Sequence, residues 1–99
     1  MNEGDIVLAE LTQSDGQTKT RPALVLRKMP PFGDGLICGI SSQLRHEVPG
    51  FDEVVLPDAL NRLRTPSVIR LGFLQVIPDY RVSGTTGRIS DSLRRELLR

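Results

Sequence analysis

The sequence Lys19-Thr20-Arg21-Pro22-Ala23-Leu24-Val25-Leu26 joins a charged segment to an unbroken apolar run, and this junction decides how the rest of the chain is interpreted. The run Pro22–Leu26 predicts a central strand buried on both faces, with proline at the first position, where a strand tolerates it. Arg21 stands at the entrance of this strand, where packing requires no charge. A guanidinium group at such a place can hold an anion.

Short apolar strands and turn-rich loops alternate along the rest of the chain. The first predicted strand is Gly4–Leu11, and the polar loop Thr12–Thr20 after it carries a Ser-Asp-Gly turn signal. The segment Met29–Gly35 holds two prolines and two glycines and is predicted to be a loop. Further strands are predicted at Leu36–Ser42, Asp52–Leu56 and Ser67–Ile77, the last with a bend or bulge at Gly72.

The C-terminal segment Ser90–Arg99 is predicted to be a helix. Ser90 is its expected N-cap, and Leu93, Leu97 and Leu98 form one apolar stripe. The segment Pro57–Pro66 has room for one helical turn. About five strands and one helix in 99 residues predict a mainly β fold, a small and strongly bent barrel or half-barrel, as a single domain over residues 1–99.

So small a barrel cannot cover both faces of its apolar strands. The uncovered apolar surface predicts a homodimer, whose interface we expect to include the third predicted strand, the C-terminal helix or both.

The composition is that of an ordinary soluble protein, with 38% hydrophobic and 25% charged residues. No apolar run is long enough to cross a membrane, and the acidic first residues lack the apolar stretch of a signal peptide. The single cysteine, Cys38, cannot form an internal disulfide and is interpreted as a small buried hydrophobe. These features predict a cytoplasmic protein without contact to a membrane.

The net charge of +1 hides an uneven distribution. Residues 1–58 carry five basic and nine acidic side chains, whereas residues 59–99 carry eight arginines and three acids. Eleven of the thirteen basic residues are arginine, whose forked guanidinium group suits phosphate and carboxylate. A genome rich in G and C would produce the same excess, so both explanations stay open.

Metal and serine-hydrolase chemistry find little support. One histidine and one cysteine cannot form a zinc site of the usual type, and no metal or other cofactor is expected. Ser41 and Ser42 lie in Gly-Ile-Ser-Ser-Gln, which is not a nucleophile elbow. His46 follows in a loop with Pro49 and Gly50 and is interpreted as a solvated loop residue.

Arginine and hydroxyl chemistry remains, and it fits the cleavage of RNA, which carries its own nucleophile in the 2′-OH. Cleavage without a metal needs proton transfer and positive charge on the pentavalent phosphate. A mechanism with two histidines is excluded because the chain has one. Arg21 can supply charge, and Ser41 can donate a hydrogen bond to a non-bridging oxygen.

Four segments resemble, in order, the MazF/PemK family of toxins from type II toxin–antitoxin systems. They are Gly4-Asp5-Ile6-Val7, residues 19–26, Ile40-Ser41-Ser42-Gln43 and Leu63-Arg64-Thr65-Pro66-Ser67-Val68-Ile69, so the resemblance covers roughly residues 4–77. It implies an SH3-like barrel of PemK/CcdB type that forms a homodimer. It also implies a metal-independent, sequence-specific endoribonuclease that cuts single-stranded mRNA and leaves cyclic phosphate ends. The expected partner is an antitoxin that blocks the RNA site, with DNA contacted only through that antitoxin.

The same resemblance assigns the site residues. It makes Arg21 and Ser41 the catalytic pair, although the family usually has threonine at the second position, whose methyl group fixes the rotamer. The residues just before Arg21 lack the acidic side chain of some members; Asp15 is the nearest carboxylate, so no general base is assigned. The residues expected to bind RNA are Lys19, Thr20, Ser42, Gln43, Arg45 and Ser67.

Two other functions fit the sequence. One is a toxin of the same fold without nuclease activity, which poisons a protein such as DNA gyrase and does not need Arg21. The other is an RNA-binding SH3-like module without catalysis, which would need exposed aromatic side chains for base stacking. Phe32 and Phe51 are the candidates for stacking, whereas Phe73 is expected in the core. Arg70 interrupts an apolar strand, either as a charge at the RNA groove or the dimer interface, or as a side chain that reaches solvent.

Overall fold

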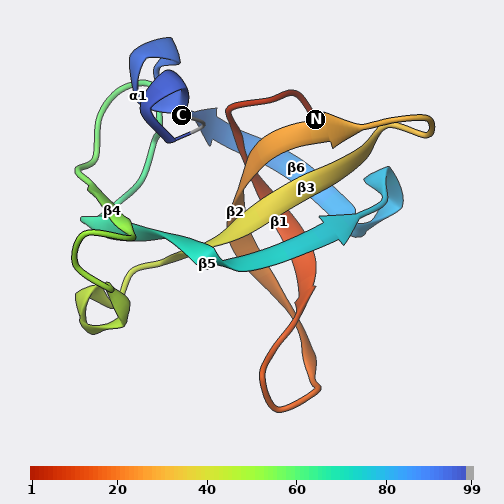
Figure 1. Cartoon of the computed structure of the whole chain (residues 1–99), viewed down its shortest axis with the longest axis horizontal. Helices are drawn as coiled ribbons and strands as arrows, with labels where there is room; N and C mark the ends of the chain where they lie inside the picture. Colours follow the sequence, from red (N-terminus) through yellow and green to blue (C-terminus); the bar gives the residue numbers. More distant parts are fainter. Residues whose placement is uncertain (98–99) are drawn as a thin grey trace.

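The computed structural model describes residues 1–97, which form one curled antiparallel sheet with short helical segments (Figure 1). Within these residues the sheet has six strands in the order β4-β5-β3-β2-β1-β6. The strands are β1 (Asp5–Thr12), β2 (Thr18–Met29), β3 (Asp34–Ser41), β4 (Glu53–Val55), β5 (Ser67–Ile77) and β6 (Val82–Arg88). The helical segments are η1 (Leu44–His46), η2 (Asp79–Arg81) and α1 (Asp91–Leu97). The prediction of a mainly β, barrel-like fold with a C-terminal helix is confirmed.

Strand β2 is longer than predicted at both ends. It pairs with β1 as far as Thr12↔Thr18 and with β3 as far as Met29↔Asp34, so cross-strand hydrogen bonding extends the strand into polar, exposed residues. The predicted loop Thr12–Thr20 therefore shrinks to a short turn, in which Gly16 takes a φ of 84° and Asp15 Oδ1 accepts a hydrogen bond from Gln17 N.

Strand β6 was not predicted. Its sequence, Val-Ser-Gly-Thr-Thr-Gly-Arg, contains two glycines and has almost no apolar pattern. It forms because its backbone pairs with β1, and the side chains of Ser83 and Thr86 donate hydrogen bonds to the carbonyl groups of Leu8 and Ile6. A Cβ atom at Gly87 would overlap the carbonyl oxygen of Asn61, so glycine lets the segment between β4 and β5 approach β6.

Apolar clusters of the chain itself cover both faces of the central strands, so the expectation that so small a barrel cannot cover them is wrong there; exposed apolar side chains remain on β5, at Leu74 and Val76. Leu24 and Leu26 of β2 point into one cluster, while Ala23 and Val25 point into the other. Cys38 is fully buried in the first cluster, as predicted, and burial raises the pKa of its thiol to about 12. The central strands β1, β2 and β3 are thereby fixed on both sides.

Helix α1 covers the first cluster with Leu93 and Leu97. Ser90 is its N-cap, as predicted, because Ser90 Oγ accepts a hydrogen bond of 3.1 Å from Leu93 N. Leu98, the third member of the predicted stripe, and Arg99 lie outside the described residues. Among residues 1–97, no helix has the length and apolar character needed to cross a membrane.

The predicted bulge at Gly72 is also present. The pairing of β5 with β3 jumps from Cys38↔Leu74 to Gly39↔Arg70, which leaves three residues of β5 outside the ladder and bends the strand. The single turn expected in residues 57–66 exists as a hydrogen bond of 3.1 Å from Arg62 N to Asp58 O, but it does not continue into a helix.

Candidate functional site

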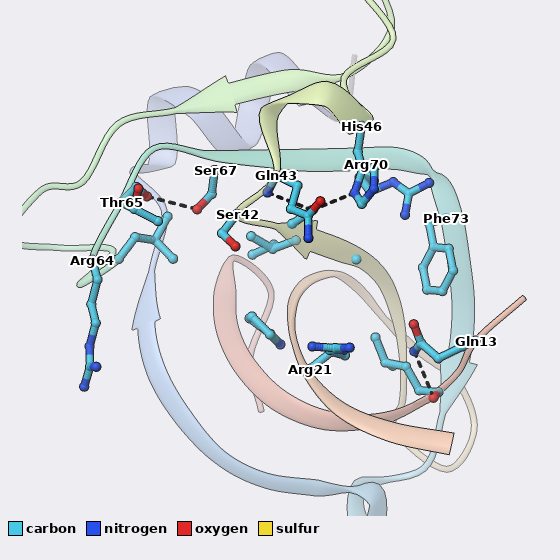
Figure 2. A pocket seen from close by; sticks show the side chains of 16 residues that line it. Gln13, Arg21, Ser42, Gln43, His46, Arg64, Thr65, Ser67, Arg70 and Phe73 are labelled. Atoms are coloured by element: carbon cyan, nitrogen blue, oxygen red, sulfur yellow. Dashed lines mark hydrogen bonds between the residues drawn. The ribbon is translucent and has the colours of Figure 1, made fainter. Parts of the chain in front are cut away.

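A cavity of about 340 Å³ opens where the start of β2, the end of β3 and the first half of β5 meet (Figure 2). The segment after β3, which includes η1, and the segment between β4 and β5 complete its walls. In Figure 2, Arg21 lies across the cavity from His46 and Arg70. The site is thus assembled from parts of the chain that are far apart in sequence.

Strand register explains why Arg21, Ser41 and Arg70 share the cavity. Ala23 pairs with Gly39, so Arg21 and Ser41 each lie two residues beyond this pair and on the same face of the sheet. On the other side of β3, Gly39 pairs with Arg70. Three neighbouring strands therefore direct these three side chains to one place.

The hydroxyl of Ser41 is held by two contacts. Its Oγ accepts a hydrogen bond of 3.1 Å from Gln43 N and lies 2.8 Å from Nδ1 of His46. The one-turn helix η1 produces the second contact, since it folds the chain back after β3 through a hydrogen bond from His46 N to Gln43 O.

The interpretation of His46 as a solvated loop residue is therefore wrong. Its side chain is half-buried, lines the cavity and bonds to Ser41. A spacing of five residues between a strand end and a histidine is a weak signal, and the sequence alone did not suggest a single 3-10 turn there.

Arg70 lies on an aromatic ring inside the site. Its guanidinium carbon is 5.3 Å from the centroid of Phe73, a distance at which a cation and a ring attract each other. Phe73 in turn packs against the backbone of Gly39, where an added Cβ atom would come within 2.9 Å of the ring. Phe73 was expected in the core; it packs partly against the second cluster but also forms a wall of the cavity.

The cavity is strongly positive. Its lining includes Arg21, Arg64 and Arg70 and no aspartate or glutamate. The ion pairs found among residues 1–97 join Glu3 and Asp91 to other arginines, so within the described part of the chain these three guanidinium groups have no carboxylate partner. Charges arranged in this way attract an anion with several oxygen atoms.

The predicted RNA-binding residues divide into two groups. Ser42, Gln43 and Ser67 line the cavity, whereas Lys19, Thr20 and Arg45 are exposed outside it. Lys19 lies on the same face of β2 as Arg21, two residues nearer the turn, and Thr20 lies on the opposite face. Ser67 is buried, and its hydroxyl donates a hydrogen bond of 3.0 Å to Thr65 O, so it also shapes the wall.

The segment between β4 and β5 contributes residues to which no role was assigned from sequence, above all Arg64. Asn61, which is 3% exposed, organises this segment: its Oδ1 accepts hydrogen bonds from Asp58 N and Leu63 N, and its Nδ2 donates one to Leu56 O. Asp58 Oδ1 accepts two more, from Leu60 N and Asn61 N. Asp-x-x-Asn is a turn-forming pattern that could have signalled an ordered loop here.

Two other features of residues 1–97 bear on whether this site has a competitor. Residues 1–97 contain no group of three or more histidine, cysteine, aspartate or glutamate side chains that could hold a metal ion. A more open cavity of about 310 Å³ lies beside β6, where Asp5 accompanies Arg62 and Arg88.

Comparison with known proteins gives one result that bears on the whole chain. A family model described as PemK-like, MazF-like toxin of type II toxin-antitoxin system matches residues 2–99. A search of curated proteins gives no match.

Proposed function

Because the chain belongs to the PemK-like, MazF-like toxins of type II toxin–antitoxin systems, we propose that it is an endoribonuclease that cuts single-stranded RNA without a metal ion. The observation that carries this proposal is the cavity itself. Arg21 and Arg70 line it together with one held hydroxyl, that of Ser41, Arg64 lies at its rim, and the ion pairs found in residues 1–97 involve none of these arginines. The substrate is messenger RNA in the cytoplasm.

The cavity suits the transition state of RNA cleavage. The 2′-OH attacks the adjacent phosphorus, the new O–P bond forms as the bond to the 5′ oxygen breaks, and the proton lost from the 2′-OH is balanced by one gained at the 5′ oxygen. The products are a 2′,3′-cyclic phosphate and a 5′-OH. Arg21 and Arg70 offset the extra negative charge of the pentavalent phosphorus, and Ser41 donates a hydrogen bond to a non-bridging oxygen.

The first test is cleavage of a single-stranded RNA by the purified protein with EDTA present. We expect cyclic phosphate ends, and Arg21→Ala should lower the rate about 10²-fold or more, because a charge contact made in the transition state is lost. Arg27→Ala is the matched control, since Arg27 lies on the same strand but outside the cavity. A strict need for a divalent ion, or a folded Arg21→Ala protein that cuts at the native rate, would refute the proposal.

Three further variants separate the need for charge from the need for side-chain geometry. Arg21→Lys should not restore the activity, because lysine lacks the forked pair of donors. Ser41→Ala should lower the rate strongly, whereas Ser41→Thr should be tolerated because its hydroxyl can keep the bonds to Gln43 N and His46. Growth inhibition that persists unchanged in the Arg21→Ala variant would instead indicate a protein target.

We also propose a homodimer formed through an apolar strip on β5. Leu74 and Val76 lie on one face of β5 and are exposed, and the exposed Phe51 lies beside Gly72 in the bulge of the same strand. Strand β3, expected in the interface, has β2 and β5 on its two edges and offers no free edge. Sedimentation should show a dimer at micromolar concentration, and Leu74→Asp should shift it toward monomer.

The family implies an antitoxin partner. We propose that an acidic segment of the antitoxin occupies the cavity, because its carboxylates and the RNA phosphates would use the same arginines. A non-cleavable RNA and the antitoxin segment should displace each other, and both affinities should fall as salt rises. Simultaneous binding without mutual effect would place the antitoxin elsewhere.

A further inference from the structure

The Ser41 hydroxyl has one proton and two lone pairs, and its surroundings limit how it can use them. Gln43 N–H occupies one lone pair at 3.1 Å. Nδ1 of His46, at 2.8 Å, can then act in two ways. In the neutral Nε2–H tautomer, the bare Nδ1 accepts the hydroxyl proton; in the imidazolium, as in the neutral Nδ1–H tautomer, Nδ1–H donates to the second lone pair.

The two states of His46 give the hydroxyl opposite directions. When Nδ1 is bare, the Ser41 proton points at the imidazole ring and is not free for a ligand. When Nδ1 carries a proton, both lone pairs of Oγ are filled and the hydroxyl proton must turn elsewhere. Since Ser41 lines the cavity, an anion bound there is the acceptor it can reach.

The charged groups around His46 attract an anionic ligand to the cavity, and such a ligand can change the state of the imidazole. Arg21 from β2, Arg64 from the segment before β5 and Arg70 from β5 line the same cavity. Beside the ring in sequence are Arg45 and the half-buried Glu47. Asp52 is engaged in hydrogen bonds with Val48 N and Leu71 N. Arginine keeps its charge throughout, whereas histidine is the side-chain type that ordinarily exchanges a proton near neutral pH, and His46 is the histidine of this cavity.

Resting on the nuclease function proposed above, we propose that His46 is a positioning residue: neutral, it is the Nε2–H tautomer and holds the Ser41 proton, and its protonation turns the Ser41 hydroxyl toward the scissile phosphate. A phosphate in the cavity favours the protonated imidazole, and the protonated imidazole presents the Ser41 proton to the phosphate. The pH profiles of binding and of cleavage therefore each gain a declining arm, a range of pH over which the measured value falls as pH rises.

The test compares pH profiles of cleavage between pH 5 and 8.5 for the native protein, His46→Asn, His46→Ala and Glu47→Gln. The asparagine amide can donate permanently from about the place of Nδ1, so His46→Asn should keep a rate within a few-fold of native but lose the declining arm. His46→Ala should lose about tenfold and the arm together, the worth of one lost hydrogen bond. Glu47→Gln, which neutralises the neighbouring acid, should keep the arm.

The double variant Ser41→Ala/His46→Asn distinguishes positioning from other roles. If His46 acts through Ser41, then Ser41→Ala alone removes the arm, and adding His46→Asn changes nothing further. An arm that survives in His46→Asn and His46→Ala, or one that disappears in Glu47→Gln, would overturn the proposal while leaving RNA cleavage intact.

Binding of an RNA with 2′-deoxyribose at the cleavage position gives a readout that does not depend on cleavage. We expect its affinity for the native protein to decline several-fold from pH 5.5 to 8, and to do so much less for His46→Asn. If the native protein binds this RNA with that profile but cuts no RNA, the nuclease function fails and the switch stands. If affinity is the same at both pH values in both proteins, the switch fails.

Discussion

Replacing Asn61 with alanine tests whether hydrogen bonds fix the shape of the segment that carries Arg64. The Asn61 side chain is 3% exposed and makes three bonds to backbone groups, at 3.0 Å from Asp58 N, 2.9 Å from Leu63 N and 2.9 Å to Leu56 O. Alanine leaves all three groups without this partner. At about 1 kcal/mol for each bond, the free energy of unfolding should fall by about 3 kcal/mol.

Urea unfolding followed by far-UV circular dichroism measures this change, since the chain has no tryptophan and a single tyrosine. With a slope near 1.5 kcal/mol per molar urea, the midpoint should fall by about 2 M at a fixed protein concentration. Asn2→Ala is the matched control: Asn2 is exposed, and the hydrogen bonds found in residues 1–97 involve its backbone and not its side chain. A fall of less than about 0.5 kcal/mol for Asn61→Ala would refute the reasoning and assign the order of this segment to packing.

Three further predictions concern single sites. The thiol of Cys38 has a pKa of about 12 in the folded chain and near 9 in the unfolded chain. Between these pH values the unfolded chain binds fewer protons, so the free energy of unfolding should fall by about 1.4 kcal/mol per pH unit. Urea titrations of the native protein, compared with Cys38→Ala, measure this fall. Gly39→Ala displaces the Phe73 ring and should weaken RNA binding about tenfold in a filter assay, with the fold retained. Gly87→Ala should destabilise the fold by about 2 kcal/mol or more, whereas Gly84→Ala, which meets no atom within 4 Å, should leave the thermal midpoint nearly unchanged.

The strands that were predicted correctly are those whose own pattern of apolar side chains indicates a strand. Strands β2 and β3 read as unbroken apolar runs because both of their faces are covered. Strand β6 has exposed, polar and glycine-rich residues, and it exists because its backbone completes hydrogen bonds offered by β1. The pattern of side chains in β6 does not show that β1 will supply its backbone hydrogen bonds.

The site divides in a similar way. Arg21 and Ser41 were singled out by their motifs, and the β2–β3 register places both at one cavity. His46 and Arg64 reach that cavity through a one-turn helix and through a loop tied by Asn61. Both turns rest on hydrogen bonds between residues no more than five apart, and the residue types in such short segments signal a turn only weakly.

The pairing of β1 with β6 has a consequence for how the chain folds. Asp5 pairs with Arg88, so the partner for one edge of β1 comes from the other end of the described chain. Contacts between residues so far apart are slow to form, because a long loop must close before any of them is made. During synthesis on the ribosome, β6 becomes available to pair with β1 only after most of the chain has been made. Until then the free edge of β1 can pair with other nascent chains.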